Sequence, residues 1–102
     1  MRLRHIEVFH AVYTTGSITA AAKLLSVSQP AVSKVLAHAE QQLGFELFLR
    51  HKGKLVPTQE AEQLIHHVTG AYENISELRR VSENLRVADA GLVRIATIPA
   101  LE

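Results

Sequence analysis

The sequence predicts a mainly α-helical fold with three short helices, a two-stranded β-hairpin and one long helix, in that order along the chain. Two observations carry this prediction. Apolar residues recur at three- and four-residue steps between capping residues in the first half of the chain, and from Thr58 to about Val87 only Gly70 interrupts a helical pattern. The boundaries that follow are residues 1–57, 58–87 and 88–102.

The first two helices are bounded by residues typical of helix ends. Gly16 follows the first helix and suits a C-terminal cap. Ser17 can cap the second helix, whose alanines allow a close approach to neighbouring helices. The apolar face of the first helix consists of Leu3, Ile6, Phe9, Val12 and Tyr13, and that of the second consists of Ile18, Ala21, Ala22 and Leu25.

A third helix and a β-hairpin complete this region. The helix starts at Gln29, has Pro30 in its first turn and is followed by Gly44 as a cap. Two extended runs follow, 47–50 and 54–56, and Gly53 can take a positive φ in the tight turn between them. The predicted buried face of the third helix is Val32, Val35 or Leu36, Ala39 and Leu43.

The long helix is longer than a domain of this size needs for its own core, so we expect it to pack on another element. Seven of its residues, all apolar except Ser82, follow steps of 4, 3, 4, 3, 4 and 3, the heptad spacing that buries one seam against another helix. A second subunit is the natural partner, packing against the first helix of the same chain is the alternative, and we expect both contacts in part. The seam consists of Leu64, Val68, Ala71, Ile75, Leu78, Ser82 and Leu85.

The last segment, 88–102, is predicted to contain a hinge and a β-strand. The run from Leu92 to Ile98 is rich in β-branched residues and lies between Gly91 and Pro99. A lone strand cannot satisfy its backbone hydrogen bonds. We therefore expect the sequence to stop just inside a second domain and to be a fragment of a longer protein.

Charge is distributed unevenly along the chain. Residues 1–56 hold seven basic and three acidic side chains, a balance of +4, whereas the remainder holds four basic and seven acidic ones, a balance of −3. This asymmetry favours the approach of the N-terminal half to a polyanion, with a chance fluctuation of surface charge as the alternative. The chain has no cysteine and no apolar run that suits a membrane span or a secretory signal, which predicts a cytoplasmic protein without membrane contact.

The second and third helices and the short turn between them match the helix-turn-helix arrangement, and the hairpin adds a wing. The predicted fold is therefore a winged helix-turn-helix that binds double-stranded DNA, with the stretch from Ser28 to Lys34 beginning the helix that enters the major groove. Gln29 can bind adenine bidentately, Ser33 can bind bases or phosphate, and Lys34 can reach guanine or the backbone. Thr19 is a weaker candidate for a backbone contact, and an ordinary exposed position is its alternative.

Three cations belong to the predicted wing. Arg50, Lys52 and Lys54 lie in or beside the hairpin, where long cationic side chains can bind phosphates or enter the minor groove. A solvated surface turn is the alternative explanation for the hairpin taken alone. The preceding helix pair favours the DNA-binding interpretation.

The segment GSITAAAKLLSVSQPAVSKVLAHAEQQLGFELFLR, from Gly16 to Arg50, resembles the DNA-binding domain of the LysR-type transcriptional regulators. The resemblance extends through the long helix. The segments that carry it, in order and at the family's spacing, are AAKLL, SQPAVS, Leu43-Gly44, Leu47-Phe48-x-Arg50 and Pro57-Thr58. Within the family, LRHIEVFHAV and PTQEA resemble regulators of basic amino acid and opine metabolism.

This resemblance implies further properties. It implies an interrupted dyad operator, a homodimer through the long helix, a tetramer of the full-length protein, and contact with RNA polymerase. It also implies a C-terminal effector-binding domain that takes a small-molecule co-inducer, with its first strand at Leu92 to Ile98. This chain itself is then expected to hold no cofactor. The implied DNA contacts are Gln29, Pro30, Ser33 and Lys34 on the third helix, and Arg50, Lys52 and Lys54 in the wing.

Two other classes of function compete with this interpretation. Six histidines suggest acid-base or metal chemistry, but His66 and His67 are adjacent and diverge on a helix, so neither an enzyme nor a metal site is predicted. His5, His10 and His38 are interpreted as surface or boundary residues. A module that binds other proteins is the second alternative, and a steep dependence of binding on salt would distinguish DNA binding from it.

Overall fold

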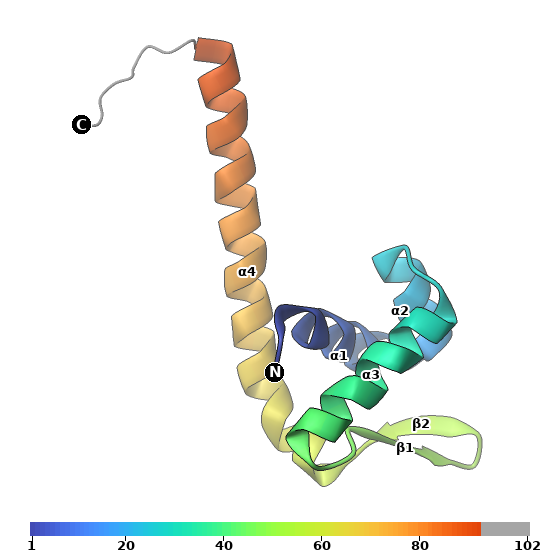
Figure 1. Cartoon of the computed structure of the whole chain (residues 1–102). Coiled ribbons are helices and arrows are strands. Elements are labelled where there is room, and N and C mark those ends of the chain that lie inside the picture. The colour runs from blue at the N-terminus through green and yellow to red at the C-terminus, as the bar shows by residue number, and fades with distance from the viewer. Residues whose placement is uncertain (93–102) are drawn as a thin grey trace. The chain divides into compact units, whose positions relative to one another are not determined.

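The computed structural model describes residues 1–92 (Figure 1). Its helices are α1 (Leu3–Thr15), α2 (Ile18–Leu25), α3 (Gln29–Leu43) and α4 (Gln59–Leu92), and its antiparallel strands are β1 (Phe48–His51) and β2 (Lys54–Pro57). The predicted mainly α fold with a two-stranded hairpin and a long helix is confirmed. Residues 1–72 form one compact unit, and α4 from Glu73 onward belongs to a second.

The short helices begin and end at the predicted residues because their caps are formed as expected. Ser17 and Ser28 each accept a hydrogen bond from the backbone N–H of the third residue of the following helix, at 3.1 and 3.2 Å. Gly16 and Gly44 adopt left-handed φ values of 74° and 84° and donate their N–H groups to carbonyls of the preceding helix. The ends of these helices are thus specified by residues that are close to them in sequence.

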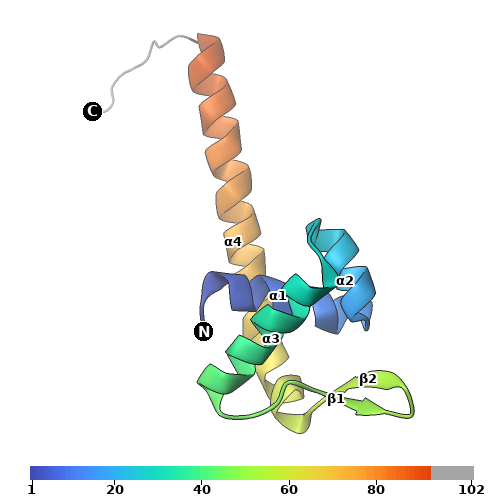
Figure 2. The ribbon, with the colours of Figure 1, turned by 45° about the vertical axis from the view of Figure 1, so that its right-hand side comes forward.

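One core lies within residues 1–72, where α1, α2 and α3 pack around each other and the first turns of α4 contribute buried residues to the same cluster (Figure 2). Phe9 is fully buried in α1, and its ring forms a T-shaped pair with that of Phe48, with centroids 5.6 Å apart, which connects the core to the hairpin. The hydrophobic residues buried in this core are Val8, Phe9, Ala11, Val12, Ala21, Ala22, Val32, Leu36, Ala39, Leu47, Ala61, Ile65 and Val68.

His5 is buried, with only 3% of its surface exposed, so the prediction that it lies at the surface or boundary is wrong. The ring is tolerated inside because both of its nitrogens have partners: Nδ1 accepts from the Arg2 N–H at 3.1 Å, and Nε2 lies 3.2 Å from His38 Nδ1. His38 is exposed and His10 is half-buried, where it stacks on Tyr72 with ring centroids 4.1 Å apart.

The hairpin differs from its prediction by one residue at three of its four strand ends, and only the start at Lys54 agrees. Leu47, predicted in the first strand, precedes β1 and is fully buried, and its N–H donates to the Glu40 carboxylate at 2.7 Å. His51, predicted in the turn, pairs instead with Lys54. The turn is therefore the two residues Lys52 and Gly53, with φ values of 52° and 79°. Two consecutive positive φ values are what a tight hairpin with right-handed strand twist requires.

The long helix begins at Gln59, one residue after the predicted Thr58, and it ends later than predicted. Thr58 caps it by accepting from the Ala61 N–H at 3.1 Å, and the same hydroxyl donates to the Glu46 carbonyl at 2.7 Å. The helix continues past Val87 to Leu92, so the predicted hinge at 88–91 is helical and Leu92 does not begin a strand. Alanines at 88 and 90, the best helix formers, extend the helix. The remaining strand prediction, 93–98, falls outside the described residues.

No helix in the part of the chain that the structure describes combines the length and apolar character needed to cross a membrane.

Candidate nucleic-acid interface

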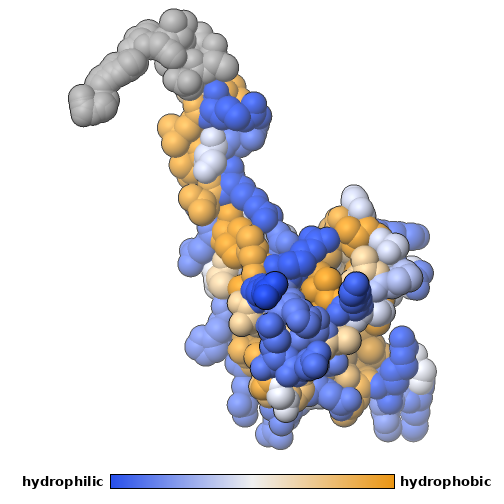
Figure 3. Space-filling view, in the orientation of Figure 1, coloured by the Kyte–Doolittle hydropathy of each residue, from blue (hydrophilic) through white to orange (hydrophobic). Residues whose placement is uncertain are grey.

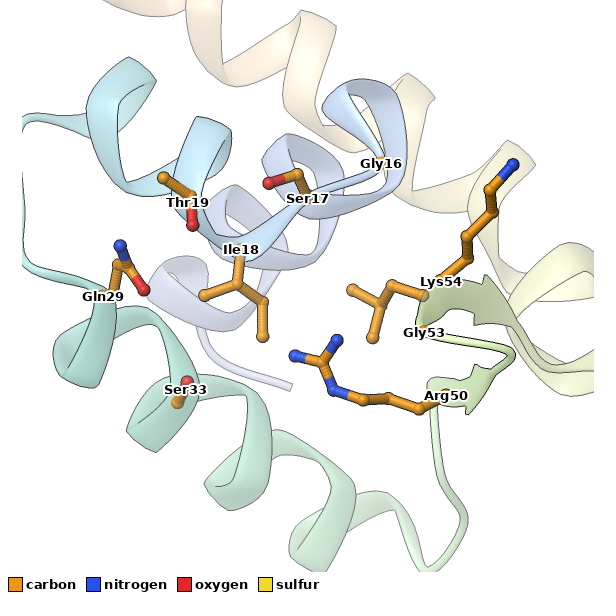
Figure 4. A pocket seen from close by; sticks show the side chains of 10 residues that line it. Gly16, Ser17, Ile18, Thr19, Gln29, Ser33, Arg50, Gly53 and Lys54 are labelled. Carbon is orange, nitrogen blue, oxygen red and sulfur yellow. The ribbon is translucent and has the colours of Figure 1, made fainter.

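A cleft of about 470 Å³ opens between the start of α2, the first two turns of α3 and the hairpin (Figure 4). All of these elements belong to the compact unit of residues 1–72. The cleft brings together three segments that are far apart in sequence. Its lining consists of Gly16, Ser17, Ile18, Thr19, Gln29, Ser33, Arg50, Gly53, Lys54 and Leu55.

Helix α3 presents Gln29 and Ser33 to this cleft. The two residues are four positions apart and share one face of the helix, and both are exposed. Val32 and Leu36, on the other face, are buried in the core and fix the rotation of the helix. An amide and a hydroxyl are thereby held on a packed scaffold with their hydrogen-bonding groups open to solvent, which suits recognition of base edges.

The hairpin supplies the positive charge of the cleft. Phe48 packs on Phe9, and Arg50, two residues further along β1, therefore lies on the same face of the strand. The register pairs Arg50 with Leu55, which also lines the cleft. In Figure 4 the Arg50 guanidinium reaches into the space between the hairpin and α3, whereas the Lys54 side chain extends away from it.

The start of α2 forms the third wall of the cleft. Of this segment, only Thr19 is predicted from the sequence as a DNA contact. The Ser17 hydroxyl caps the helix, and the backbone of its first turn carries N–H groups and the positive end of the helix dipole. Such an end favours an anion. The signal was present in the sequence as a capping serine followed by a short helix, but only the fold places it beside Gln29.

The electrostatic character of the cleft is cationic. Arg50 and Lys54 line it, and none of the lining residues that the structure describes is acidic. Together with the α2 terminus, these groups provide positive charge around the polar side chains of α3. This arrangement can bind a polyanion while its bases are read by hydrogen bonding.

The other predicted contact residues lie around the cleft rather than in it. Ser28 is exposed and its hydroxyl oxygen serves as the cap of α3, and Pro30 is exposed in the first turn. Lys52 lies at the tip of the hairpin turn. Lys34 is exposed but lines a different hollow, because adjacent residues on a helix point about 100° apart and Ser33 already faces the wing.

The predicted seam on α4 divides into two parts. Val68 is buried in the core of the same chain and Leu64 is half-buried against it, while Ala71 and Ile75 are half-buried. Leu78 and Leu85 are each 65% exposed, and Ser82 is exposed too. Figure 3 shows apolar side chains running along this part of α4, where Val81 and Val87 are also exposed.

Among residues 1–92, no group of three or more histidine and acidic side chains is arranged to hold a metal ion.

The family model of the bacterial regulatory helix-turn-helix proteins of the lysR family matches residues 3–62, which include all three short helices and the hairpin. This chain belongs to the LysR family. The LysR-type domain predicted from the motifs between Gly16 and Arg50 is thereby confirmed.

Curated relatives of this LysR-family chain carry the names of transcriptional regulators. The regulator DgcR of a Pseudoalteromonas species is 57% identical over 99% of this chain and 35% of its own length. The octopine catabolism/uptake operon regulatory protein OccR of Rhizobium meliloti is 39% identical over 99% of this chain and 34% of its own length. The predicted resemblance to opine-related regulators, and the predicted class of regulator rather than enzyme, are therefore confirmed. The chain spans about a third of the length of these relatives.

Solved structures agree with the fold. The DNA-binding domain of BenM in complex with benA site 1 DNA superimposes with a TM-score of 0.72 and 31% sequence identity, covering 86% of this chain and 97% of that one. A probable transcriptional regulator of Pseudomonas aeruginosa superimposes with a TM-score of 0.71 and 36% identity, covering 76% of this chain and 26% of that one.

Proposed function

We propose that this chain is the operator-reading part of a dimeric regulator, which places α3 in the major groove of double-stranded DNA and the wing on the flanking backbone or minor groove. The cleft that joins Gln29, Ser33 and Arg50 is the observation that carries the proposal. Gln29 and Ser33 read base edges, and Arg50 anchors the adjacent strand. Lys52 and Lys54 add phosphate contacts at the wing.

We propose that the operator is an interrupted dyad. A single copy of α3 spans only a few base pairs, so one chain reads a half-site. Two copies related by a two-fold axis can address successive major grooves about 34 Å apart and double the phosphate contacts. The exposed side chains Leu78, Ser82 and Leu85 of α4 are the surface that we assign to this pairing, while Val68 remains in the core of its own chain.

The remaining properties concern the whole protein, of which we expect this chain to be the DNA-binding third. We propose that a small-molecule co-inducer binds a C-terminal domain, that the full-length protein forms a tetramer, and that it acts in the cytoplasm, with RNA polymerase as a further partner. DNA-complex structures of a relative's DNA-binding domain support only the DNA-binding element of this scheme.

The deciding experiment is selection of bound sequences from random duplexes with this chain, followed by anisotropy titrations of the selected and a scrambled duplex at several salt concentrations. We expect an enriched sequence with two half-sites one helical turn or a multiple of it apart. We also expect affinity to fall steeply between about 50 and about 200 mM salt. No enrichment, together with binding that is insensitive to salt, would identify a protein-interaction module instead.

A further inference from the structure

A second hollow, of about 330 Å³, lies between the start of α1 and the middle of α3. Three cationic side chains line it, Arg2 just before α1, Arg4 within α1 and Lys34 on α3, and Lys34 is also a predicted DNA contact. None of its lining residues within the described chain is acidic. The lining consists of Arg2, Arg4, His5, Lys34, Val35 and His38.

This hollow lies on the flank of α3 opposite the wing. Val32, Leu36 and Ala39 point into the core. Successive residues turn by about 100°, so one flank of the helix carries Ser33 and Ala37, which face the hairpin residues, and the other carries Val35 and His38, which face α1. Lys34 stands between these flanks on the exposed ridge.

A hydrogen-bonded chain fixes the start of α1 on this flank. The Arg2 N–H donates to His5 Nδ1 at 3.1 Å, so Nε2 of the neutral ring carries the proton and donates to His38 Nδ1 at 3.2 Å. The two rings are packed edge to face with centroids 5.2 Å apart. The backbone that carries Arg2 and Arg4 is therefore held against α3 through the buried side chain of His5.

The two arginines keep donors available for a ligand. The side chain of Arg4 is 47% exposed and forms a 3.3 Å ion pair with Glu7 through one of its two terminal nitrogens. A guanidinium has five N–H donors, so this ion pair occupies only part of its capacity. Arg2 is exposed at the N-terminal cap of α1.

We infer that Arg2, Arg4 and Lys34 bind backbone phosphates of the DNA strand that runs along the flank of α3 opposite the wing; this rests on the proposed function. A helix about 10–12 Å wide in a major groove about 12 Å wide has the backbone of one strand on each side. On the side of the wing, Arg50 and Lys54 contact the phosphates of one DNA strand. Arg2 and Arg4 then contact the phosphates of the other DNA strand, so cationic side chains bind DNA on both flanks of α3.

The test is the salt dependence of binding by the full 102-residue chain to a short duplex containing one selected half-site. Each phosphate contact adds about 0.9 to the slope of log affinity against log salt, so the double variant Arg2→Gln/Arg4→Gln should lower the slope by about 1.8. The variant Arg2→Lys/Arg4→Lys keeps both charges and should retain the slope. Arg80→Gln/Arg86→Gln removes the same charge from exposed ion pairs on α4 and should also retain it.

Two results would overturn the inference without touching the proposed function. One is an unchanged slope in the Arg2→Gln/Arg4→Gln variant while the wild-type chain binds steeply. The other is an equal reduction in the α4 control, which would make the effect one of net charge. A wild-type chain with no salt dependence would instead overturn the proposed function itself.

A second measurement does not depend on how the variants fold. Phosphate ethylation interference on the wild-type complex should mark phosphates on both strands bordering the groove that α3 occupies. Interference confined to the strand next to the wing overturns the inference.

Discussion

The imidazole of His5 has a pKa below its usual value, because burial disfavours its charged form and electrostatic interactions with His38, the N-terminus and Arg2 disfavour that form further. Protonation of His5 would also place a proton on Nδ1, where the Arg2 N–H already donates. The folded chain therefore favours the neutral ring. The unfolded chain, with an ordinary histidine pKa, takes up a proton more readily.

We predict that this difference makes the folded chain less stable as the pH decreases. Because the folded pKa is depressed, the contribution is present above the unfolded pKa of about 6.5 and is lost as the pH falls below it. Thermal unfolding at about pH 7.5 and about pH 5.5 should show a larger decrease in Tm for the wild-type chain than for His5→Gln, which cannot titrate. Equal decreases in both proteins would contradict the prediction.

The two polar side chains of α3 should contribute to specificity more than to overall affinity. We expect Gln29→Ala and Ser33→Ala each to reduce the discrimination between selected and scrambled DNA by about 1–3 kcal/mol, because lost base contacts weaken only the cognate complex. Competition binding with both duplexes measures this difference. Gln42→Ala, exposed near the end of the same helix, is the control and should leave the discrimination intact.

Equal losses on the two duplexes would assign Gln29 and Ser33 to the DNA backbone rather than to base edges.

At the scale of the elements, Glu40 connects α3 to the wing. Its Oε2 accepts from the N–H groups of Leu47 and Phe48 at 2.7 and 3.4 Å. We predict that Glu40→Ala lowers the free energy of unfolding by about 1–3 kcal/mol, because the N–H of the buried Leu47 loses its acceptor. Urea denaturation measures the loss, and Gln41→Ala, an exposed neighbour, should change stability little. A loss of similar size in the control would mean that the effect belongs to the helix and not to this link.

The elements themselves were largely predictable because their ends are local. Ser17, Ser28, Gly16 and Gly44 act through residues at most four positions away, so the sequence alone places the short helices. The interior position of His5 was not predictable, because it depends on His38, 33 positions later in the chain. The cleft was predictable through α3, the wing and Thr19, but not as one site, since the approach of the α2 terminus to α3 is a tertiary event.

The end of α4 was misplaced for a different reason. The β-branched run after Gly91 suggested a change of structure at 88, but the preceding residues have helical propensity of their own and remain in the helix to Leu92. Propensity changes gradually along a chain, so it does not mark a helix end at one residue.

At the scale of the whole molecule, the exposed apolar side chains of α4 predict self-association. Leu78→Arg should shift the chain from dimer towards monomer, because a charge in a packed seam loses its hydration without gaining a partner. Sedimentation velocity measures the change. Ser76→Arg adds the same charge outside the seam and should leave the dimer intact. An unchanged dimer in the Leu78→Arg chain would show that the seam lies elsewhere.

The turn at the tip of the wing has a consequence for how far this protein can be stabilised. Lys52 adopts a left-handed φ of 52°, a conformation that disfavours an ordinary side chain by roughly 1–2 kcal/mol and that asparagine adopts more readily. Lys52→Asn would therefore make a firmer hairpin and remove one cation at the same time. Since Lys52 is one of the proposed phosphate contacts, thermal stability and DNA affinity make opposite demands on this residue, and we expect selection for heat resistance alone to lower the affinity.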